Sequence, residues 1–173
     1  MQHESTGDPR ELSKTERLRL QASETRDETS RLAALLVLAR HYADAADGVN
    51  GIATAREART LALHLKDYPA AADALSSASI SHYHRSDYVS AVAAAMDAWD
   101  FAVRANAPTK IVDSYFAIAL SIMALGVLDA ASQVIEKGLA MCAEAPGLHD
   151  AEIRLVGLKA MLHFHHDDFA ELA

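Results

Sequence analysis

Apolar residues from Arg31 onward recur at spacings of three and four positions, which is the period of a helix with a buried face. Short polar or glycine- and proline-containing breaks interrupt the pattern. They predict about seven helical segments of about 15 to 20 residues, with the sequence stopping inside an eighth. The breaks fall at Asp47-Gly48, Tyr68-Pro69, Ser86-Asp87, Ala107-Pro108, Gly126, Pro146-Gly147 and His166-Asp167.

Residues 1–29 follow a different pattern. Polar and charged side chains dominate this stretch, and its few aliphatic residues include Leu12, Leu18 and Leu20. A helix in this stretch would therefore have a narrow apolar stripe and bury little surface. We predict two parts: a polar lead-in over 1–29, mobile or a loosely docked helix, and a helical repeat domain over 30–173.

The helical part is internally repetitive. The stretch HYHRSDY at 82–88 returns as HFHHDDF at 163–169, and IMALGVL at 122–128 lies about halfway between. Small residues also recur at matching places, where two antiparallel helices would cross closely. They are Ala43, Ser79, Ala119 and Ala160; Ala55, Ala91 and Ala131; and Ala62, Ala98 and Gly138. This alignment gives repeats at about 31–68, 69–107 and 108–146, and an incomplete one at 147–173.

These small positions resemble the tetratricopeptide repeat (TPR) family, whose helix pair carries small residues at its eighth, twentieth and twenty-seventh positions. The resemblance covers 31–173, with the Tyr88, Ala91 and Ala98 pattern as its best match. It implies an all-α, right-handed α-solenoid of about 3.5 repeats that serves in protein–protein interaction. The spacing of 36 to 41 residues exceeds the family's usual 34. In this the chain is similar to the amino-terminal TPR regions of bacterial signalling proteins, including some diguanylate cyclases. That likeness implies a sensory or dimerisation segment, with catalysis in another domain.

Composition narrows the class of protein further. The chain has 36 alanines but 7 glycines and 4 prolines, which excludes an all-β fold. A formal charge of −8 argues against nucleic acid or an anionic membrane surface as a partner. The single cysteine, Cys142, fits a reducing compartment, and we find no secretion signal or membrane span. We therefore expect a cytoplasmic protein.

In the TPR-like interpretation, the first helix of each pair lines a concave face with an apolar floor and an acidic rim. Such a face suits a peptide, a helix or a second copy of the chain. The expected lining is Val37, Arg40, Asp44, Asp73, Ser76, Ile80, Tyr83, Asp113, Phe116, Leu120, Met123, Arg154, Met161 and Phe164. A shift of one residue would instead bury Ile80, Phe116 and Leu120 in the core, and both interpretations stay open.

Motifs for chemistry are few. The sequence holds no glycine-rich phosphate loop, no Gly-x-Ser-x-Gly and no His-Glu-x-x-His, so we expect no catalysis, cofactor or metal. A third possibility is a metal- or small-molecule-binding helical domain that uses His82, His84, His163 and His165. The competing interpretation is that aspartates such as Asp87 cap the following helix.

The last predicted helix pair lacks its second helix, and a solenoid end without a polar cap exposes apolar surface. We expect this surface to include Leu155, Leu158, Leu162 and Phe164. Such an end would be covered either by further chain or by a second copy. We therefore predict an assembly surface there and a homodimer of this segment.

Overall fold

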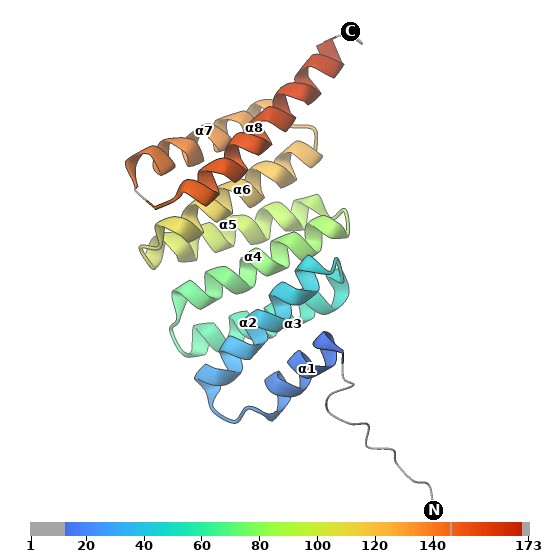
Figure 1. Cartoon of the computed structure of the whole chain (residues 1–173), viewed down its shortest axis with the longest axis vertical. Coiled ribbons are helices and arrows are strands. Elements are labelled where there is room, and N and C mark those ends of the chain that lie inside the picture. Colours follow the sequence, from blue (N-terminus) through green and yellow to red (C-terminus); the bar gives the residue numbers. More distant parts are fainter. Residues whose placement is uncertain (1–12, 146, 171–173) are drawn as a thin grey trace, which may run out of the picture.

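The computed structural model describes residues 13–145 and 147–170, with side chains as far as Phe164. These residues form a stack of helices without strands (Figure 1). The helices are α1 (Lys14–Glu24), α2 (Glu28–Asp44), α3 (Gly48–His64), α4 (Tyr68–His84), α5 (Tyr88–Arg104), α6 (Pro108–Ala124), α7 (Leu128–Glu144) and α8 (His149–Ala170). The all-α repeat architecture predicted from the sequence is confirmed.

The stack has two layers. Helices α2, α4, α6 and α8 form one layer and α3, α5 and α7 form the other (Figure 1). Each helix contacts its neighbours in sequence, and α2, α4, α6 and α8 also contact one another in turn. Since contacts run only between adjacent repeats, the structure is a solenoid rather than a closed bundle.

The repeat is more regular than the sequence alignment indicated. Helices α2 to α7 have 17 residues each and are joined by three-residue connections, so the helix pairs recur every 40 residues. The alignment used 36 residues for the first repeat and was wrong there by four positions. In the structure, Gly51 rather than Ala55 corresponds to Ala91, and Ala39 rather than Ala43 corresponds to Ser79.

Each connection reverses the chain in the same way. Its middle residue has a positive φ, from 50° at Asn106 to 78° at Gly126, which stops the preceding helix. Aspartates then cap the next helix, because their carboxylates accept a hydrogen bond from a backbone N–H in the first turn. This occurs at Asp27, Asp47, Asp67 and Asp87, which are 20 residues apart. The predicted capping role of Asp87 is thereby confirmed.

Small residues allow the two layers to pack closely. The buried positions of α3 and α5 are glycine and alanine throughout, and Ala58 and Ala98 have no exposed surface. A Cβ at Gly51 would lie 2.3 Å from Ser81 Oγ, so this crossing requires glycine. Larger residues such as Leu35 and Ile135 fill the space between neighbouring pairs. The alanine-rich composition is therefore explained by helix crossings.

The lead-in predicted over 1–29 contributes α1, which docks on α2. Ser13 and Glu16 form a reciprocal capping box at its start. Leu18 and the buried Ala22 pack on the core of the first repeat, and Thr15 Oγ1 lies 2.8 Å from His41 Nε2. Residues 1–12 lie outside the described part, so the proposed division between lead-in and repeat domain stays a prediction.

Candidate binding groove

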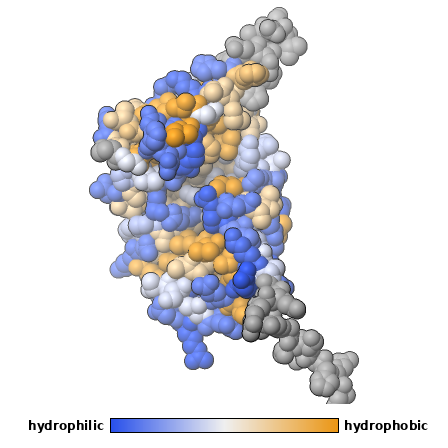
Figure 2. Space-filling model, in the orientation of Figure 1, coloured by the Kyte–Doolittle hydropathy of each residue, from blue (hydrophilic) through white to orange (hydrophobic). Residues whose placement is uncertain are grey.

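A cavity of about 940 Å³ opens across the layer of α2, α4 and α6, with α1 and α8 at its two ends. We call it the groove. Figure 2 shows hydrophobic residues in a hollow on this face, bordered by hydrophilic ones. The groove is lined by the predicted residues Val37, Arg40, Asp44, Asp73, Ser76, Ile80, Tyr83, Asp113, Phe116, Leu120 and Arg154.

The floor of the groove follows from the 40-residue repeat. Positions 36, 76 and 116 carry Leu36, Ser76 and Phe116, while positions 40, 80 and 120 carry Arg40, Ile80 and Leu120. Corresponding positions face the same way, because the helices have equal length and equal connections. Phe116 and Leu120 are half-buried: they pack on the core cluster and line the groove as well. The two interpretations of these residues are therefore both correct in part.

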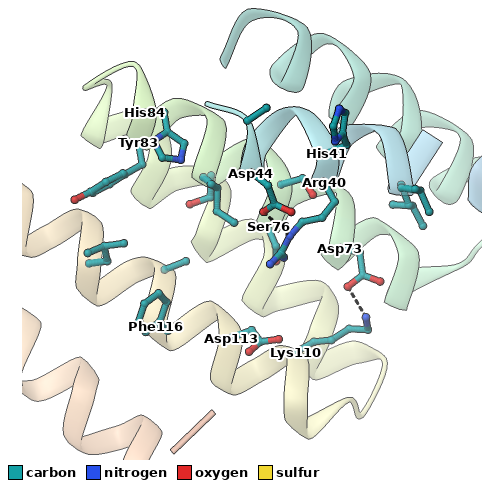
Figure 3. Close-up of a pocket in the computed structure, with 18 of the residues that line it drawn as sticks. Arg40, His41, Asp44, Asp73, Ser76, Tyr83, His84, Lys110, Asp113 and Phe116 are labelled. Atoms are coloured by element: carbon teal, nitrogen blue, oxygen red, sulfur yellow. Dashed lines mark hydrogen bonds and ion pairs between the residues drawn. The ribbon is translucent and has the colours of Figure 1, made fainter. Parts of the chain in front are cut away.

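Ion pairs cross the groove from helix to helix. Lys110 of α6 pairs with Asp73 of α4, and Arg154 of α8 pairs with Asp113 of α6. Arg40 pairs with Asp44 within α2 at 3.0 Å, and Figure 3 shows these charges above the apolar side chains. The rim was expected to be acidic. It is instead neutralised locally, since each of its three aspartates has a cationic partner.

Aromatic and imidazole groups lie at one side of the groove. Tyr83 packs against Tyr88 with ring centroids 5.4 Å apart, and partial burial raises the pKa of Tyr83. His84 lies next to Tyr83, and His41 lies beside Arg40 and Asp44 (Figure 3). These groups supply contact area and hydrogen-bonding atoms rather than a nucleophile with an adjacent base.

Three predicted lining residues lie elsewhere. Met123 is buried, because its position on α6 points between helices into the cluster around Ile135. Met161 and Phe164 are exposed on α8 but lie outside the groove. Sequence reasoning missed Lys14, Leu18, Leu36, His41, His84 and Lys110. An exact 40-residue register would have found Leu36 and His84, since they correspond to Phe116 and Asp44.

The predicted assembly surface is largely wrong. Leu155, Leu158 and Leu162 are buried, because they pack on α6 and α7. Phe164 alone among the four predicted residues is exposed. Helix α8 has apolar residues on two opposite faces, and the prediction selected the inner one.

The structure gives no support to a metal site among the residues it describes. No group of three or more histidine, cysteine, aspartate or glutamate side chains lies close enough to hold a metal ion in that part of the chain. His82 Nδ1 lies 3.1 Å from Asp87 Oδ2 at a helix end, while His165 has no described side chain. Cys142 is buried, and this burial raises its thiol pKa. Within the same described range, no helix is long and apolar enough to cross a membrane.

Solved structures share this architecture. The apo form of RapI matches with a TM-score of 0.69 at 14% identity, over 90% of this chain and 45% of RapI. A putative kinesin light chain from Podosopora anserina, described as having nearly identical TPR-like repeats, matches with a TM-score of 0.63, and a point variant of it matches with 0.64. Both are 16% identical, over 91% of this chain and 80% and 79% of theirs.

These comparisons establish a TPR-like helical repeat fold. The chain spans about half the length of RapI, to which it is similar. No protein-family model matches the sequence. No curated protein matches it either. The narrower resemblance to signalling proteins such as diguanylate cyclases stays a prediction.

Proposed function

We propose that the chain is a non-catalytic, cytoplasmic protein-interaction module whose groove binds the apolar side of a peptide or helix. The observation that carries this proposal is an apolar floor that continues across α2, α4 and α6 in a cavity of about 940 Å³. Three repeats contribute to one surface, so an elongated ligand would contact all of them.

The dimensions of the layer favour a short helical or extended segment. Packed helices lie about 8–10 Å apart, so three of them span about 16–20 Å between the outer axes. A helical ligand rises about 1.5 Å per residue and would need about 12 residues to cross that distance. This supports a peptide ligand over a compact small molecule.

The charges of the groove favour a ligand with an apolar, weakly charged contact face. Asp44, Asp73 and Asp113 already have cationic partners, so a charged ligand would have to compete with these pairs. Binding should therefore rest on apolar burial, and it should depend only weakly on ionic strength.

Selection from a random 12-residue peptide library on the wild-type chain would test this proposal. The selected peptides should lose binding to an Ile80→Asp, Leu120→Asp double variant, and to Ser76→Arg, which places a long side chain in the groove without burying a charge. The control is a Val89→Asp, Met96→Asp variant on the outer face of α5, where both residues are exposed. Equal binding to all variants, each with wild-type circular dichroism, would refute the proposal.

A further inference from the structure

Helix α8 carries a second apolar face, opposite to the one that packs on α6 and α7. It consists of Ile153, Val156, Gly157, Ala160, Met161 and Phe164, and we call it the α8 outer face. Ile153 is 55% exposed, Val156 52% and Phe164 76%. Figure 2 shows hydrophobic residues along this helix. Exposed apolar residues in one continuous stripe are typical of a contact surface.

The repeat shows which kind of element such a face receives. Since α6 starts at Pro108 and α8 at His149, Ile153 corresponds to Val112, Ala160 to Ala119 and Phe164 to Met123. Val112 and Ala119 have no exposed surface, and Met123 is buried as well. In α6 these positions lie in the layer that α7 and α8 cover, and no helix in the described range covers α8 in this way. The α8 outer face is thus shaped for an antiparallel helix.

We propose that this helix is α8 of a second copy, packed antiparallel about a twofold axis near Gly157 and Ala160. The pattern of residue sizes is self-complementary in this arrangement. Gly157 and Ala160 lie at the centre, where they let the two backbones approach, and a Cβ at Gly157 would meet no atom within 4 Å. Ile153 of one copy then lies opposite Phe164 of the other, and Val156 lies opposite Met161.

Charge on the flank of the stripe supports the antiparallel direction. Glu152 and His163 are 11 residues apart, close to three turns, so they lie on the same side of the α8 outer face. In an antiparallel pair, Glu152 of each copy comes opposite His163 of the other. In a parallel pair, Glu152 would face Glu152. On the opposite flank Arg154 is already paired with Asp113.

The proposed dimer does not depend on the groove, but it would extend it. Gly157 and Met161 correspond to Phe116 and Leu120, the floor residues of α6. With α8 paired, the floors of the two copies would continue through these positions into one another. Such a dimer would offer an elongated ligand two adjoining binding surfaces.

Sedimentation velocity on the full chain, from about 5 to about 500 µM, tests the proposal, because a single helix pair lies at the small end of the interface range. We expect the wild type to shift from monomer to dimer within this range. Ala160→Glu should stay monomeric throughout, while Val89→Glu, an exposed substitution on α5, should behave as wild type. A monomeric wild type, or dimerisation by Ala160→Glu, would overturn the proposal.

Cross-linking tests the antiparallel direction in a Cys142→Ser background. Gly157→Cys mixed with Ala160→Cys should form a disulfide-linked heterodimer, whereas a parallel pair would link Gly157→Cys to itself. The groove variant Ile80→Asp, Leu120→Asp should still dimerise. Loss of peptide binding with an intact dimer, or the reverse, would therefore separate failure of this proposal from failure of the proposed groove function.

Discussion

The crossing of α7 and α8 makes the sharpest energetic prediction. A Cβ at Gly138 would lie 2.7 Å from Leu155 Cδ1 and 3.3 Å from Tyr115 Cβ. Leu155 is fully buried beside Val112 and Cys142. This glycine and this leucine should therefore be energetically coupled: either residue sets how much space the other can occupy.

The magnitudes follow from opposing terms. Leu155→Ala leaves a cavity and should lower the free energy of unfolding by about 2–5 kcal/mol. Gly138→Ala in the wild type gains about 1 kcal/mol of helix propensity and loses about 1–3 kcal/mol to overpacking, so we expect a net loss. In the Leu155→Ala background the overpacking is relieved, and Gly138→Ala should then stabilise by about 1 kcal/mol.

Urea unfolding of the four proteins, followed by helical circular dichroism in dilute solution, measures the coupling. We expect an interaction free energy of about 1–3 kcal/mol. Gly157→Ala is the control, since its added methyl group meets no atom within 4 Å and should give the same gain in both backgrounds. Additivity of Gly138→Ala and Leu155→Ala within about 0.5 kcal/mol would refute this account of the crossing.

Further predictions concern the helix caps and the thiol. Side-chain and backbone hydrogen bonds from Ser30 and Ser90 lower the pKa of Asp27 and Asp87, so their stabilisation is complete above the unfolded pKa and lost as pH falls through the folded pKa. The melting temperature should therefore fall on acidification below about pH 4, and less steeply when both residues are changed to asparagine, which also caps helices. Ala107 provides no side-chain cap, so Ala107→Asp should raise the urea midpoint, by about 1 kcal/mol in stability. The buried Cys142 has a raised pKa and should react slowly with a disulfide reagent at pH 8 until urea unfolds the chain.

The sequence was sufficient for the helices and for most of the groove lining. Breaks such as Ala107-Pro108 marked the true connections, and the spacing of Asp73, Phe116 and Leu120 placed them on one face. The regular 40-residue period was also present in the sequence, as the capping aspartates at 27, 47, 67 and 87. The alignment missed it because it matched Ile52 with Tyr88, whereas glycine stands at the start of α3.

Other features required the three-dimensional structure. Helix α8 is apolar on both faces, so periodicity could not distinguish Leu158, which is buried, from Phe164, which is exposed. The neutralised rim depends on pairs between helices, such as Lys110 with Asp73, that are 37 residues apart in the sequence. The packing of α1 on α2 likewise depends on contacts such as Thr15 with His41.

The central claim is that the face of α2, α4 and α6 binds a protein segment. Hydrogen exchange of the wild-type chain, with and without a peptide selected from the 12-residue library, tests it most directly because it locates the bound peptide. The account predicts slower exchange at the groove ends of Tyr68–His84 and Pro108–Ala124, and unchanged exchange in Tyr88–Arg104. Slower exchange confined to α3, α5 and α7 would contradict it.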